Sequence, residues 1–74
     1  MNHLEKRLQE LPITEREKEI AWLVVKGHSN AEIAVRCNIT EHTVKDHLKS
    51  VYRKTGVRQR TALQARLMGL DGSS

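Results

Sequence analysis

The side chains best suited to chemistry form a basic cluster between positions 45 and 60. Lysine and arginine can donate hydrogen bonds to guanine O6 and N7 in the DNA major groove, and both can neutralise phosphates. A basic run can equally be a solvated helix face, so the elements that carry it decide its role. Asp46 is the only acidic residue within the cluster, which consists of Lys45, Lys49, Arg53, Lys54, Arg58 and Arg60.

The net charge of +4 is a small difference between two unlike halves. Residues 1–35 contain five Lys or Arg and six Asp or Glu, whereas residues 36–74 contain eight and three. The basic excess therefore lies in the C-terminal half, where it could face an acidic partner such as a nucleic acid.

Length and composition argue against several function classes. A chain of 74 residues forms one domain that buries only about 60% of its unfolded surface, which leaves little room for an enzyme pocket. One Cys cannot form an intrachain disulfide, and no Cys and His pattern fits a zinc site, so neither metal nor cofactor is expected. One Trp, one Tyr and no Phe disfavour a platform for stacking single-stranded bases. Without a long apolar run, the chain is expected to be cytoplasmic and to make no membrane contact.

Helical periodicity runs through the chain, and capping residues predict where each helix begins and ends. Thr14 with Glu17, and Ser29 with Glu32, form two capping-box patterns. The expected fold is therefore all-α, a four-helix bundle-like domain with a central helix-turn-helix and a short N-terminal amphipathic segment. The remaining boundaries are expected at Gly27, Asn38, Thr40, Gly56, Gln59 and Gly69, with Gln59 a poor N-cap.

The expected domain covers residues 13–69, preceded by an amphipathic segment or linker at 1–12 and followed by a flexible tail at 70–74. The segment carries three leucines at helical spacing. We expect them to fold back over Trp22, which lies off the main apolar stripe of its helix, unless a partner domain covers that residue. The three leucines are Leu4, Leu8 and Leu11.

The second and third helices have the dimensions of a helix-turn-helix, with about eight residues, a turn of about four at 37–40, and a longer capped helix to about Thr55. At about 100° per residue, the long helix separates into two faces. Such a helix fits the major groove, where its first residues normally reach base edges. The apolar face holds Val44, Leu48, Val51, Tyr52 and Thr55, and the polar face holds His42, Lys45, Asp46, Lys49, Ser50 and Arg53.

Five stretches resemble, in order and spacing, the LuxR/FixJ-type helix-turn-helix of bacterial transcriptional regulators. The resemblance covers residues 13 to about 68 and implies a four-helix domain that binds double-stranded DNA sequence-specifically as a homodimer. RNA polymerase is kept as a further candidate partner. The stretches read ITERE at 13–17, GHSNAEIA at 27–34, ITEHTVKDH at 39–47, YRKTGV at 52–57 and RTA at 60–62.

Carried over position by position, the resemblance implies that Lys45 and Lys49 read bases, and their place on the helix adds His42 and Asp46. Asp46 departs from many members of the family. A carboxylate cannot approach a phosphate but can accept a hydrogen bond from cytosine N4, so we expect Asp46 to narrow the sequence preference. The resemblance also implies phosphate contacts for Asn30, Thr40, Thr43, Arg53 and Arg58, and a dimer surface on the last helix formed by Leu63, Arg66 and Leu67.

Some alternatives stay open at this point. Glu17 either caps its own helix or forms the ion pair with Arg60 that the resemblance suggests. The chain is also similar to a region-4-like module of a sigma factor, which would need core polymerase to bind a promoter. A protein-interaction module would use the same basic face without DNA specificity. An enzyme is not expected, because the sequence shows no nucleophile with a paired base, no phosphate loop and no metal set.

Overall fold

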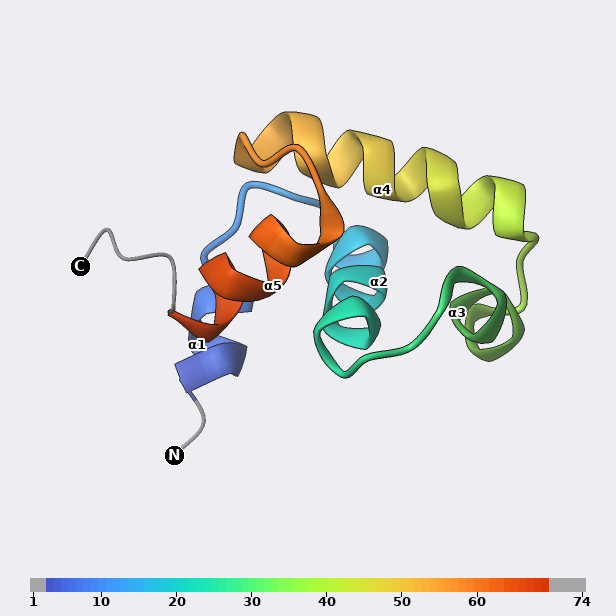
Figure 1. The fold of residues 1–74 in the computed structure, drawn as a ribbon, viewed down its shortest axis with the longest axis horizontal. Coiled ribbons are helices and arrows are strands. Elements are labelled where there is room, and N and C mark those ends of the chain that lie inside the picture. The colour runs from blue at the N-terminus through green and yellow to red at the C-terminus, as the bar shows by residue number, and fades with distance from the viewer. Residues whose placement is uncertain (1–2, 70–74) are drawn as a thin grey trace.

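The structure is a computed structural model that describes residues 3–69, and it confirms an all-α fold. The segment expected to be amphipathic forms the first helix, and the expected tail at 70–74 lies outside the described residues. The described part of the chain contains no β-strand. Its helices are α1 (His3–Gln9), α2 (Glu15–Val25), α3 (Asn30–Cys37), α4 (Glu41–Thr55) and α5 (Arg60–Met68) (Figure 1).

The helix boundaries agree with the capping residues. Thr14 and Ser29 each complete a capping box with the glutamate three residues later. Thr40 caps α4 by accepting a hydrogen bond from the backbone N of Thr43 at 3.1 Å. Asn38 ends α3 in the left-handed region, with φ 57°, which an Asn tolerates better than most residues. The turn of the helix-turn-helix is therefore residues 38–40, one residue shorter than expected because α3 continues through position 37.

Helix α2 lies at the centre of the molecule and is contacted by each of the other four helices (Figure 1). Ile20 and Val24 of α2 are fully buried, as is Ile33 of α3. Helix α4 crosses above α2 and also packs against α3, so its orientation is set by two helices. The other fully buried large side chains come from α4 and α5, namely Val44, Val51, Leu63 and Leu67.

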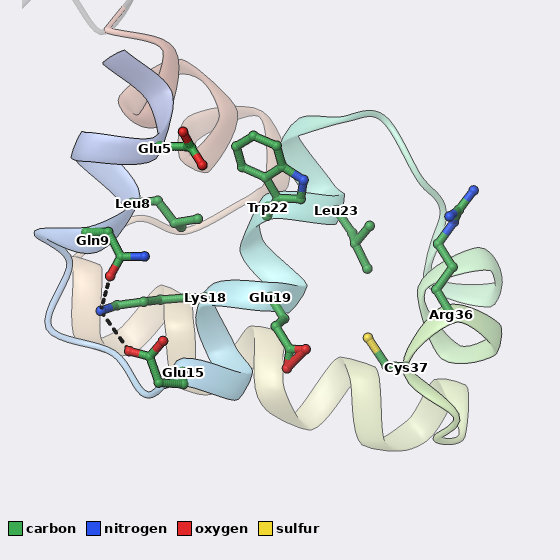
Figure 2. Close-up of a pocket in the computed structure, with 10 residues that line it drawn as sticks. All are labelled: Glu5, Leu8, Gln9, Glu15, Lys18, Glu19, Trp22, Leu23, Arg36 and Cys37. Carbon is green, nitrogen blue, oxygen red and sulfur yellow. Dashed lines mark hydrogen bonds and ion pairs between the residues drawn. The ribbon is translucent and has the colours of Figure 1, made fainter. Parts of the chain in front are cut away.

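The N-terminal segment folds back onto the core, while the covering of Trp22 by its leucines stays a prediction. Helix α1 packs against α2 and α5, and its Leu8 is buried. Trp22 remains half-buried at the edge of a groove between α1, α2 and α3, and the ammonium of Lys26 lies 4.8 Å from its ring centroid (Figure 2). Lys18 closes the end of the groove through hydrogen bonds of 3.2 Å to both Gln9 and Glu15.

Candidate nucleic-acid interface

The exposed face of α4 carries the predicted base-reading residues together. The opposite face is buried through Val44, Leu48 and Val51, so the helix has one fixed orientation on the core. Thr55 completes that buried stripe and satisfies its hydroxyl by donating to the carbonyl of Val51 at 2.7 Å. The outward side chains are His42, Lys45, Asp46, Lys49 and Arg53, all of them exposed.

Ser50 does not belong to this outward face. Its residue is half-buried, and its hydroxyl is one of the groups that lower the pKa of the Glu17 carboxylate on α2. The prediction that placed Ser50 on the polar face is therefore wrong, because position 50 lies at the flank where α4 meets α2.

Glu17 anchors α4 to α2 through Lys54. The ammonium nitrogen of Lys54 lies 2.9 Å from Oε1 and 3.3 Å from Oε2 of the Glu17 carboxylate. The same carboxylate accepts from the backbone N of Thr14 at 2.9 Å, which completes the capping box of α2. Glu17 thus serves its own helix and a tertiary ion pair at once, and the partner is Lys54. The alternative that paired it with Arg60 is wrong.

The pKa of Glu17 reflects these bonds. Burial would raise it, but the hydrogen bonds from Thr14, Ser50 and Lys54 and the charge of Lys54 outweigh burial and lower the pKa to about 2. Glu17 is therefore ionised at neutral pH and pairs with the ammonium of Lys54 where α4 meets α2.

Arg60 joins the start of α5 to the start of α3. Its Nη1 donates to Oδ1 of Asn30 at 2.8 Å, and its Nη2 donates to the backbone carbonyl of His28 at 2.6 Å. Asn30 is half-buried, and its side-chain oxygen is the acceptor in this contact. The pattern of the sequence contained no signal for this bridge, which joins residues 30 positions apart.

The other residues predicted to contact phosphate lie on two further elements. Thr40 is exposed at the N-cap of α4, and its hydroxyl lies 2.9 Å from that of Thr43. The partial positive charge at this helix end suits an anion. Arg53 and Arg58 are both exposed, but Arg58 lies in the loop between α4 and α5, away from the outward face of α4.

His42 and Asp46 face each other on the outward face of α4. The Nε2 atom of His42 lies 3.5 Å from Oδ2 of Asp46, one helical turn away. Both side chains remain well exposed. The two residues are therefore neighbours on this exposed face.

The predicted dimer surface needs correction. Leu63 and Leu67 have zero exposure, so neither can touch a second chain without opening the core. Their spacing of four residues marks the inward stripe of α5, which packs on α1 and α2. Arg66 is exposed, but its guanidinium donates to the carbonyl of Thr55 at the end of α4. The outward side of α5 instead borders a hollow lined by Gly56, Val57, Arg58, Gln59, Ala62, Ala65 and Arg66.

Two kinds of feature are absent from residues 3–69. No group of three or more His, Cys, Asp or Glu side chains in this range is arranged to hold a metal ion. None of the described helices combines the length and the apolar character needed to cross a membrane.

Comparison with known proteins adds evidence of another kind. Residues 11–67 match the sequence pattern of the family described as "Bacterial regulatory proteins, luxR family". The chain is also similar to the "Response regulator protein VraR" of Staphylococcus aureus and of Staphylococcus epidermidis, with 47% identity over 62 residues in each case. The alignment covers 81% of this chain but only 29% of either relative, so the chain spans less than a third of their length.

Proposed function

The chain belongs to the luxR family of bacterial regulatory proteins and carries its helix-turn-helix, and we propose that it regulates transcription as a homodimer with α4 in the major groove of double-stranded DNA. The observation that carries the proposal is the outward face of α4. Its side chains are exposed, and its cations stand on a helix that α2 and α3 hold in place. An α-helix presented in this way fits the width of the major groove.

The outward face would offer both hydrogen-bond donors and hydrogen-bond acceptors to base edges. Lys45 and Lys49 would donate to guanine O6 and N7, with His42 beside them. Asp46 would accept from the N4 amino group of cytosine, since it is exposed and can approach a donor on a base. In this role Asp46 narrows the sequence preference. Asp46→Ala should then relax the preference at one base pair, whereas a uniform gain in affinity for every duplex would contradict it.

Phosphates on either side of the groove would be held by groups around α4. Thr40 and Thr43 stand at its first turn, Arg53 lies towards its end, and Asn30 begins α3. Arg58 is a further candidate from the loop after α4. Such contacts orient a protein on the duplex without reading sequence.

The dimer would form through the outward side of α5, with Val57, Ala62 and Ala65 in place of the buried leucines. We assign the DNA-binding domain to residues 13–69, preceded by the segment at 1–12, whose helix α1 packs on the domain. The proposed role is binding, with no catalytic step, and the proposed place is the cytoplasm, where a bacterial regulator meets DNA and RNA polymerase.

The test is selection of bound duplexes from a random-sequence pool by the purified chain, followed by footprinting. A regulator should enrich one motif and bind it roughly 10³-fold or more above unrelated DNA. A symmetric dimer should protect half-sites whose centres lie about 10 base pairs apart, or a multiple of that. Enrichment of no motif would favour a protein-interaction module. A motif bound only when core polymerase is added would favour the sigma-factor alternative.

A further inference from the structure

The bridge between Arg60 and Asn30 has no role in the proposed reading of bases, yet its geometry is well defined. Two nitrogens of one guanidinium reach two acceptors, the Asn30 side-chain oxygen and the His28 carbonyl, at 2.8 and 2.6 Å. A planar guanidinium can hold two acceptors in a fixed geometry, and a lysine ammonium is less suited to this because its single nitrogen imposes no such plane. The bridge therefore constrains the orientation of the Asn30 side chain and ties the start of α5 to the start of α3.

That constraint decides which end of the Asn30 amide is available. An Asn side chain carries an acceptor oxygen and a donor NH2 group on the same planar unit, and rotation exchanges them. Because the oxygen is bound to Arg60, the NH2 group is the part left to meet a ligand. A phosphate oxygen can accept from NH2 but would be repelled by the amide oxygen. An Asn30 free to rotate would offer the wrong end part of the time.

We infer that Arg60 is a positioning residue of the DNA-binding surface, which acts by holding the Asn30 amide with its NH2 group presented to a phosphate. The inference rests on the proposed function and deepens it. The Arg60 side chain is half-buried, and its guanidinium already donates to the two acceptors. Arg60 is therefore not the group that contacts the DNA in this proposal. Arg60 also belongs to α5, the helix that carries the proposed dimer surface. One side chain therefore links that surface to a proposed phosphate contact on α3.

The first experiment is Asn30→Asp, with affinity measured on a duplex that the wild-type chain selects from a random pool and on an unrelated duplex. An aspartate at this position would pair with Arg60 and would suit the start of a helix, so the thermal midpoint should stay the same or rise. The carboxylate would face a phosphate, and affinity should fall about tenfold or more for both duplexes alike. A drop in affinity without a drop in stability is a result that a merely structural role would not give.

The second experiment is a double-mutant cycle of Asn30→Ala with Arg60→Met on the same two duplexes. If Arg60 acts through Asn30, each single variant should lose affinity and the double variant should lose no more than the Asn30→Ala variant. Arg60→Lys keeps the charge but not the planar fork, and should fall between wild type and Arg60→Met. Arg16→Met is the matched control, since Arg16 is also a cation that donates to a backbone carbonyl, that of Cys37, and its loss removes the same charge. It should show no coupling to position 30.

A spectroscopic readout keeps the inference testable if Arg60→Met lowers stability. The two Nδ2 protons of Asn30 should shift in nuclear magnetic resonance spectra when the selected duplex is added, and they should shift less in Arg60→Lys. Independent losses that multiply in the double variant, or an Asn30→Asp variant that binds as well as wild type, would overturn the inference while leaving the proposed function intact. If the wild-type chain selects no duplex at all, it is the proposed function that fails, and the inference fails with it.

Discussion

Two groups of basic residues in the C-terminal half differ in what they bind. On the outward face of α4, Lys45, Lys49 and Arg53 make no hydrogen bond or ion pair with any part of the chain that the structure describes. At the seam where α4 and α5 meet the other helices, Lys54, Arg60 and Arg66 each bind an acceptor on another element. The seam cations tie helices of the domain together, whereas the outward cations stay unpaired among the described residues and are the proposed contacts to DNA.

The neighbours Arg53 and Lys54 test this division most directly. Lys54→Met leaves the buried Glu17 carboxylate without its cation, so the free energy of unfolding should fall by about 2–3 kcal/mol. Urea denaturation followed by circular dichroism would measure it. The matched control is Arg53→Met, which removes an exposed cation next to it and should change stability by less than about 0.5 kcal/mol. Equal losses in the two variants would remove the distinction between seam and outward face.

Acid should weaken the ion pair between Glu17 and Lys54 at the seam. The pKa of Glu17 is lowered to about 2 in the folded chain from an ordinary value of 4.5. A carboxyl with a depressed folded pKa stabilises the fold above its unfolded pKa, and this contribution is lost as the pH falls from about 4.5 towards 2. Glu17→Gln keeps the capping pattern but removes the charge. The wild type should therefore lose more stability than this variant between pH 5 and about 2.5, and parallel curves would contradict the assignment.

Lys49 should affect binding and leave stability unchanged. Lys49→Ala should cost about 1–3 kcal/mol on the selected duplex and relax the preference at one base pair, because the side chain would donate to a base edge. Binding to single-base variants of that duplex would measure both effects. An unchanged preference at every position would show that Lys49 contacts only the backbone.

Arg53 should give the smallest and least specific effect. Arg53→Ala should weaken binding to all duplexes alike and reduce the slope of log affinity against log salt by about one, because one phosphate neutralisation is lost. Titrations at several salt concentrations would show it. A change that depends on sequence would move Arg53 into the base-reading set.

The helix ends and the two faces of α4 could be predicted because their signals are local. Thr14, Ser29 and Thr40 each bind a backbone group three residues along the chain, so the cap and its target lie in the same short stretch of sequence. The separation of Val44 and Leu48 from Lys45 and Lys49 follows from helical periodicity alone. The outward base-reading residues were therefore predicted correctly as exposed, while their contact with bases stays a prediction.

The residues that were misplaced all depend on where a second helix lies. The family resemblance assigned Leu63 and Leu67 to a dimer surface, but both side chains are buried where α5 packs on α1 and α2. Ser50 lies near the edge of the polar face, and only the approach of α2 places it inside. The contact between His42 and Asp46 could have been predicted from the sequence, since a spacing of four residues brings side chains together on a helix.

The sequence by itself determined the all-α fold, the helix boundaries, the helix-turn-helix and the basic excess of the C-terminal half. The signal for each of these features lies within a few neighbouring residues or in the overall composition. Only the tertiary structure decided which cations are committed to the fold. Glu17 pairs with Lys54, which lies 37 positions away in the sequence, and Arg60 binds Asn30, which lies 30 positions away. Helical periodicity keeps Lys54 off the outward face, but no local signal identifies the acceptor of Lys54 or of Arg60, because that choice rests on which acceptors the packed helices bring within hydrogen-bond distance.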